Sequence, residues 1–121
     1  MRKPGTNELN VQMSDVICDF CHHEWTDARP MVEGHQGSCI CGSCLTVAYT
    51  ELALLNEAPA PAGYTCRLCL EQRDDPGWPS PVDETAVICR RCAKQSAGVL
   101  HKSKDYDWTK PRVPTSDDET A

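Results

Sequence analysis

Large apolar side chains are scarce in this sequence. Its 121 residues include one phenylalanine, three tryptophans and three tyrosines. A chain of this length forms one domain or two very small ones, and neither buries enough apolar surface to be stable by burial alone. Cross-links, either disulfides or bound metal, must therefore contribute to folding.

Long apolar stretches are also missing. No run approaches the ~18 apolar residues of a membrane-spanning helix, and the chain does not open with the charged start and apolar stretch of a secretory signal. We therefore expect a soluble, cytoplasmic protein with no membrane partner. Disulfides rarely persist in that reducing compartment, so the nine cysteines, an odd number, are expected to bind metal.

Eight of the nine cysteines form two copies of one pattern, in which two Cys-x2-Cys pairs are separated by nineteen residues. The first copy consists of Cys18, Cys21, Cys41 and Cys44, and the second, 48 residues later, of Cys66, Cys69, Cys89 and Cys92. This is an internal duplication. Because two such pairs supply the four tetrahedral ligands that zinc prefers, the sequence predicts two zinc ions per chain. Four thiolates leave no open coordination position, so both sites are expected to be structural.

Three other side chains near these cysteines are potential ligands. Cys39 has Val87 at its position in the second copy, so we expect it to be a small apolar residue of a strand. Alternatively, Cys39 is a substitute metal ligand or a reactive thiol. His22 and His23 are not expected to bind metal, because the second copy has no histidine there and still has four cysteines.

The repeat also predicts the domain organisation and a small, metal-stabilised α+β fold with disordered termini. Each finger is expected to be treble-clef-like, with a cysteine knuckle or β-hairpin followed by a helix. We expect a flexible segment at 1–15, a first zinc finger at 16–56, a proline- and alanine-rich linker at 57–63, a second finger at 64–103 and a flexible acidic tail at 104–121.

Two helices are expected after the third cysteine of each copy. Apolar residues at spacings of three and four predict a helix from Ser43 through Asn56. The second helix is interrupted by Gly98, which costs about 1 kcal/mol in a helix interior, so this helix is expected to be short or to end there. Short strands are expected over 37–40 and 85–88.

The charge of the chain limits its partners. The formal net charge is −6, and each zinc with four thiolates adds about −2, which disfavours a general nucleic-acid binder. Residues 18–55 carry one basic and five acidic side chains, whereas residues 66–103 carry six and five. No nucleophile beside a base, paired carboxylates or open metal site is evident, so we do not expect an enzyme.

The cysteine motifs resemble the N-terminal zinc-binding domain of the ClpX family, over roughly residues 16–56 and 64–101. The resemblance rests on Cys18-Asp19-Phe20-Cys21 and Ile40-Cys41-Gly42-Ser43-Cys44-Leu45, and on Cys66-Arg67-Leu68-Cys69 and Val87-Ile88-Cys89-Arg90-Arg91-Cys92. It implies a treble clef with one structural zinc that forms a dimer and recruits adaptors and substrates for an attached AAA+ motor. The motor's Gly-x4-Gly-Lys-Ser/Thr loop does not occur here, so recruitment is expected without unfoldase activity.

Because that family's domain pairs with itself, the two copies are expected to dock as an intramolecular pseudo-dimer that buries Leu45, Tyr49, Leu52 and Val99; a homodimer is the alternative. The leading functional prediction is a zinc-binding protein–protein interaction module, an adaptor or a substrate-recruiting protein. A thiol or zinc redox sensor is one alternative. The other is nucleic-acid binding through the basic residues of the second finger, which are Arg67, Arg73, Arg90, Arg91, Lys94 and Lys102.

Overall fold

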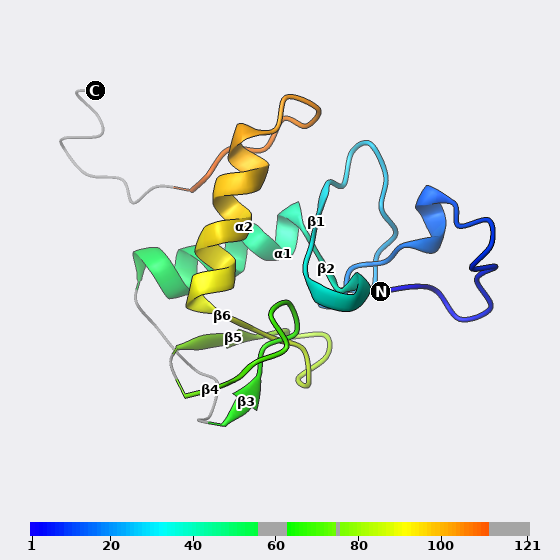
Figure 1. The fold of residues 1–121 in the computed structure, drawn as a ribbon. Helices are drawn as coiled ribbons and strands as arrows, with labels where there is room; N and C mark the ends of the chain where they lie inside the picture. The colour runs from blue at the N-terminus through cyan, green and yellow to red at the C-terminus, as the bar shows by residue number, and fades with distance from the viewer. Residues whose placement is uncertain (56–62, 75, 112–121) are drawn as a thin grey trace.

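The computed structural model describes residues 1–55, 63–74 and 76–111. It is a small α+β fold of short antiparallel sheets and helices (Figure 1). We call residues 16–55 the first module and residues 63–103 the second module. The elements are η1 (Met13–Asp15), β1 (Met31–Glu33), η2 (His35–Gly37), β2 (Cys39–Cys41), α1 (Gly42–Tyr49), η3 (Thr50–Leu54), β3 (Tyr64–Thr65), β4 (Gln72–Arg73), β5 (Gly77–Pro79), β6 (Val87–Cys89) and α2 (Arg90–Lys102).

In the first module, β1 pairs with β2, which leads directly into α1. Cys41 is the N-cap of this helix, and its sulfur accepts a hydrogen bond from the backbone of Cys44. The predicted single helix over 43–56 is instead α-helical to Tyr49 and π-helical in η3, and residue 56 lies outside the described residues. Within this stretch Thr50 Oγ1 donates to the Thr46 carbonyl at 2.7 Å, a side-chain bond that competes with regular helix hydrogen bonding.

In the second module, β3 pairs with β4, and β5 pairs with β6, which leads into α2. The prediction that this helix is short or ends at Gly98 is wrong, because α2 continues to Lys102. Its buried face includes Ala93, Ala97 and Leu100. Packing of this face offsets the cost of about 1 kcal/mol that an interior glycine imposes.

The two modules repeat the same local hydrogen bonds. The backbone N–H of Gly42, the first residue of α1, donates to the carbonyl of Pro30 at 2.9 Å. Arg90, the first residue of α2, donates in the same way to Pro76 at 3.0 Å. Pro30 and Pro76 are therefore equivalent although they lie 46 residues apart. The connection between β5 and β6 contains the two extra residues that restore the cysteine period of 48.

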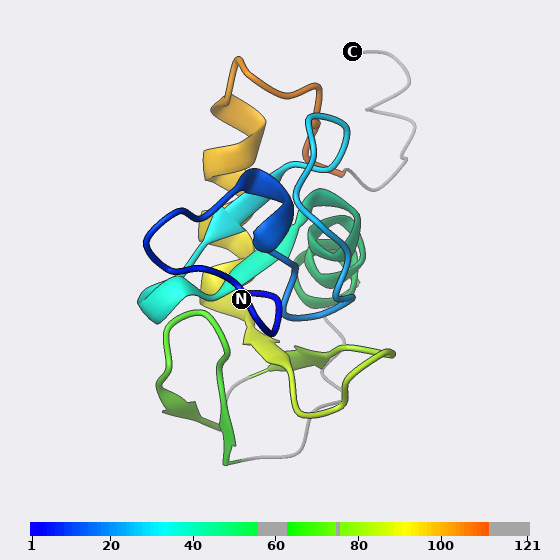
Figure 2. The ribbon, with the colours of Figure 1, turned by 90° about the vertical axis from the view of Figure 1, so that its right-hand side faces the viewer.

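The modules pack against each other through their helices, with α2 lying across α1 (Figures 1 and 2). Leu45 and Leu52 are fully buried and Tyr49 packs against the same core, as expected for docked copies. Val99 was wrongly placed in this interface, since it is 62% exposed. The reason is the helix phase: the buried stripe of α2 runs through Ala97 and Leu100, and Val99 lies outside it.

The segments beyond the modules also make contacts. In the segment expected to be flexible at 1–15, the Met1 carbonyl accepts from the backbone of Ile17 at 2.7 Å. In the expected tail, Trp108 contacts α1. Residues 57–62 of the expected linker and 112–121 of the tail lie outside the described residues. Over the described ranges, no helix combines the length and the apolar character that crossing a membrane requires.

Candidate metal centres

The first centre combines four cysteines from three elements. Cys18 and Cys21 lie in the knuckle before β1, Cys41 ends β2, and Cys44 lies in the first turn of α1. Their sulfur atoms all lie within 4.8 Å of one another, with Cys18–Cys44 at 3.9 Å and Cys21–Cys41 at 3.6 Å. A tetrahedron with zinc–sulfur bonds of about 2.3 Å has edges of about 3.8 Å. The cluster therefore fits a zinc ion.

Backbone amides surround the sulfur atoms of this centre. Cys18 Sγ accepts from the N–H groups of Phe20 and Cys41, each at 3.3 Å. The turn is closed by His22, whose φ of 64° is left-handed and whose N–H donates to the Cys18 carbonyl at 2.8 Å. Leu70 closes the second knuckle in the same way, with a φ of 62°. Amide donors directed at sulfur favour the thiolate form that metal requires.

The second centre repeats this arrangement. It consists of Cys66, Cys69, Cys89 and Cys92, whose sulfur atoms also lie within 4.8 Å of one another. Cys66 Sγ accepts from the Cys89 backbone at 3.4 Å, and Cys89 Sγ accepts from that of Cys92 at 3.4 Å. Among the residues the structure describes, these are the two groups of three or more histidine, cysteine or carboxylate side chains close enough to hold a metal ion. Each of the two four-cysteine groups can hold a zinc ion.

Close packing of the thiols perturbs their proton affinities. The hydrogen bond from Cys18 lowers the pKa of Cys41, while the same interaction raises the pKa of Cys18 to about 12. In the second centre, the bond with Cys89 lowers the pKa of Cys66, and that of Cys89 is raised to about 11. Without metal the thiols share protons, so binding zinc as four thiolates must release protons.

The other potential ligands lie outside both clusters. Cys39 is buried in β2, and burial raises the pKa of its thiol. His22 Nε2 lies 3.6 Å from Asp83 of the second module. His23 lines a groove rather than a metal site. Among the described residues, the structure groups the eight repeated cysteines and leaves Cys39, His22 and His23 outside both groups.

The arginines near the second centre are held by protein partners. Arg91 Nη2 donates to Glu71 Oε2 at 2.6 Å, and this bond lowers the pKa of Glu71 and raises that of Arg91. Arg90 Nε donates to the carbonyl of Leu52 in the first module at 2.9 Å. Arg90 thus joins the two modules in addition to its place beside a dianionic metal site.

Sequence reasoning missed the reciprocal contacts between the knuckles and the opposite module. The Leu68 carbonyl accepts from the His35 backbone at 2.8 Å. The equivalent Phe20 carbonyl accepts from the Ser80 hydroxyl. A side chain at Gly34 would place Cβ 2.7 Å from the Leu68 carbonyl oxygen. The only sequence signals were the small residues at the equivalent positions 34 and 80.

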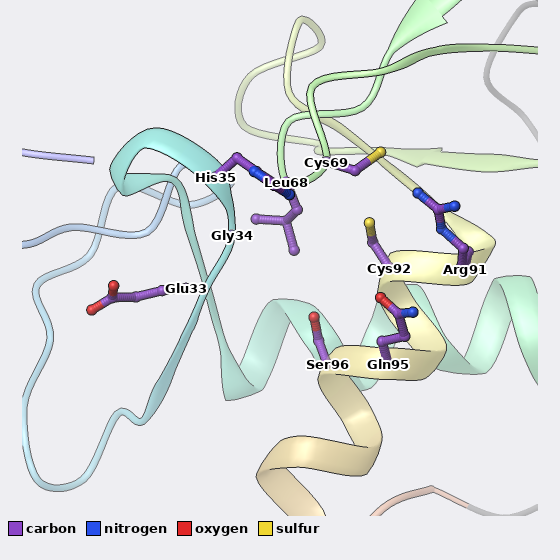
Figure 3. Close-up of a pocket in the computed structure, with 9 residues that line it drawn as sticks. All are labelled: Glu33, Gly34, His35, Leu68, Cys69, Arg91, Cys92, Gln95 and Ser96. Atoms are coloured by element: carbon purple, nitrogen blue, oxygen red, sulfur yellow. The ribbon is translucent and has the colours of Figure 1, made fainter.

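These contacts border two equivalent grooves, each beside one metal centre and between the modules. The apolar groove has a volume of about 260 Å³ and includes Phe20, Val47 and Val82 in its walls. The polar groove, of about 360 Å³, has Arg91 on one wall and His35 on the other (Figure 3). The scaffold is the same, but the two copies line it with different chemistry.

The two centres place this chain in the class of C4-type zinc-binding modules. Residues 16–53 match the model of one family in that class, the ClpX C4-type zinc finger. The match spans the first centre and α1, whereas the second group of four cysteines lies beyond it. No curated protein and no solved structure matches the chain.

Proposed function

We propose that this protein is a protein-interaction module, an adaptor or recruiting protein without enzymatic activity, built on two structural zinc ions. The observation that carries this proposal is the apolar groove. Its lining includes the apolar side chains of Phe20, Val47 and Val82, and it lies beside a metal centre with no free coordination position. Zinc in such a site holds the walls of the groove in place and does not act on a substrate.

The groove needs both modules. The first module supplies Phe20 and Val47, and the second supplies Trp78, Pro81 and Val82. The rings of Phe20 and Trp78 lie 5.9 Å apart between centroids, which fixes the base of the groove. Apolar side chains gathered in an exposed concave surface are typical of a binding site for an apolar segment.

The arrangement of each module supports a treble-clef pair. In each, a cysteine knuckle precedes a two-stranded sheet, and the second cysteine pair begins a helix. The knuckles contact each other's modules reciprocally, as the subunits of a two-fold symmetric dimer do. We therefore propose an intramolecular pseudo-dimer, in which one chain forms the assembly that the ClpX-type resemblance implies for two.

Two exposed valines test the proposed function. Val82 lies in the groove and is 61% exposed, while Val99 lies on α2, outside the groove, and is 62% exposed. The experiment captures proteins from a lysate on zinc-loaded wild type, Val82→Asp and Val99→Asp. Quantitative mass spectrometry measures the amount of each protein captured. We expect Val82→Asp to lose the proteins captured by wild type and Val99→Asp to retain them. Identical capture by both variants would contradict an interaction through the groove.

Nucleic-acid binding is the second candidate. It is favoured by the gathering of Arg90, Arg91 and Lys94 around one hollow at the start of α2. A redox role for Cys39 has less support, since its thiol is buried and has a raised pKa.

A further inference from the structure

A hollow of about 250 Å³ at the start of α1 is lined in part by the chain's own C-terminal segment. Pro30, Gly42 and Thr46 line this first hollow together with Trp108. The indole Nε1 of Trp108 donates to the Gly42 carbonyl at 3.0 Å and to Thr46 Oγ1 at 3.1 Å. Gly42 leaves room for the ring, because an added Cβ would lie 2.9 Å from Trp108 Cδ1. From this acidic and aromatic segment, Tyr106, Asp107 and Trp108 line the hollow.

The second module has an equivalent hollow at the start of α2. The carbonyl of Pro76 bonds to the first helix residue as that of Pro30 does, so the two hollows have the same backbone frame. This second hollow has a volume of about 420 Å³. Its lining among the described residues is Pro76, Arg90, Arg91, Lys94 and Gln95. These residues come from the second module alone, so Tyr106, Asp107 and Trp108, which line the first hollow, do not line the second.

The chemistry of the second hollow differs from that of the first by charge. Arg90 stands where the first module has Gly42, and Lys94 where it has Thr46. Arg91 replaces the remaining neutral residue, Ser43. Arg91 and Lys94 are exposed. The second hollow therefore presents cations at three positions that are neutral in the first, around the same proline-backed space.

We propose that the second hollow binds an acidic, aromatic segment of a partner protein at the place equivalent to that of Trp108. Because Arg90 replaces the glycine that leaves room for Trp108, the ring of the partner lies against the Arg90 side chain and not in the position of Trp108. In this arrangement the aromatic ring packs against Pro76 and the stem of Arg90, and flanking carboxylates meet Lys94 and Arg91. The proposal rests on the proposed function, since it assigns a partner class and a second surface to the interaction module.

The structure favours a short acidic peptide over a nucleic acid. Arg90 is bonded to the Leu52 carbonyl and Arg91 to Glu71, so both guanidinium groups are held in place at the surface of one small hollow. The chain as a whole has a net charge of −6, which repels a long polyanion. A peptide with two or three carboxylates is attracted by the local cations and experiences less of this repulsion.

The experiment uses the zinc-loaded full chain and a fluorescein-labelled peptide with the sequence of residues 104–109, Lys-Asp-Tyr-Asp-Trp-Thr. A control peptide carries asparagine in place of both aspartates. Fluorescence anisotropy would compare wild type with Lys94→Glu and with Lys102→Glu, an identical charge change in the last turn of the same helix. We expect the aspartate peptide to bind, Lys94→Glu to weaken it roughly ten-fold or more, and Lys102→Glu to change it by less than about two-fold. The NMR chemical shifts of the backbone amides of Lys94 and Gln95 should change on peptide binding.

Three results would overturn the proposal. Equal weakening by Lys94→Glu and Lys102→Glu would show general attraction to α2. If the peptide changed the amide chemical shifts of Gly42 and Thr46 but not that of Lys94, it would be displacing Trp108 from the first hollow. A single-stranded oligonucleotide that binds more tightly and competes with the peptide would assign the surface to nucleic acid. Val82→Asp is expected to leave peptide binding at the second hollow unchanged. A failure of the second-hollow proposal can therefore be distinguished from a failure of the interaction through the apolar groove.

Discussion

Asp19 and Arg67 hold the same position in the two modules, and their side chains face each other with Oδ2 and Nη1 3.6 Å apart. Each follows the first cysteine of its module, and each donates its backbone N–H to the strand that leads into the helix. Equivalent residues meet in this way only near a two-fold axis. Pairing two copies of the same module would place aspartate against aspartate or arginine against arginine, so this position favours docking of the unlike modules within one chain.

Reversing the charge at Arg67 should weaken docking. Arg67→Asp places a second carboxylate beside Asp19, which is buried at 5% exposure, and we expect the free energy of unfolding to fall by roughly 1–3 kcal/mol. Denaturant titration of the zinc-loaded protein would measure the loss. Arg67→Ala removes the cation without adding a like charge and should cost less. Equal losses for the two variants would contradict repulsion at this position.

Zinc should hold the two modules together as one cooperative unit. Native mass spectrometry of protein purified without added metal is expected to show two zinc ions per chain, and chelation should abolish the circular dichroism of the folded state. Cys44→Ser should lose the first zinc and also lower the thermal stability of the second module, because the helices share one core. A single zinc in the wild type, or the mass of an iron–sulfur cluster, would contradict the pair of structural zinc sites.

Two helical glycines should respond to alanine in opposite directions. Gly98 has no atom within 4 Å of an added Cβ, so Gly98→Ala should stabilise the protein by roughly 0.5–1 kcal/mol. Gly42→Ala should destabilise it, because the new Cβ collides with Trp108. Thermal denaturation would report both effects, and a shift of tryptophan fluorescence should accompany Gly42→Ala alone. Stabilisation by both substitutions would show that Trp108 does not occupy the first hollow.

Cys39 should be protected from thiol reagents at neutral pH. Burial raises its pKa above the ordinary value of 9.0, because the thiolate is disfavoured inside the core. The contribution of the neutral Cys39 thiol to the free energy of unfolding is therefore fully present below pH 9.0, the ordinary pKa. It is lost as the pH rises through the raised pKa of the folded protein. Alkylation of the zinc-loaded protein, followed by mass spectrometry between pH 6 and 10, is expected to show modification of Cys39 only at the alkaline end. Rapid modification at pH 7 would return a reactive-thiol role to this residue.

The metal clusters could be predicted from the sequence because their signal is local and periodic. Cys-x2-Cys spacing determines how two thiols converge, and the repetition at 48 residues separated the paired cysteines from Cys39. The structure brings the two predicted sets of four together. Helix limits were harder to predict, because packing decided them: α2 continues through Gly98 on the strength of its buried face.

Contacts between distant segments could not be predicted from spacing. Trp108 received no role in the sequence analysis, although it lines the first hollow and donates to the carbonyl of Gly42, 66 residues earlier in the chain. Val99 was placed in the interface from its apolar character, yet the rotation of α2 exposes it. The equivalence of Pro30 and Pro76 was hidden by the two additional residues between β5 and β6. Each of these features depends on tertiary packing, which one sequence does not specify locally.

The unlike linings of the two grooves have a consequence for how this protein can change. In a dimer of identical chains, every substitution is present twice, so an aspartate that suits one site is imposed on the other. Here position 47 is valine and its equivalent, position 95, is glutamine. A single mutation alters one groove and leaves its counterpart intact. Because the two grooves differ at equivalent positions of one chain, selection can act on each of them separately.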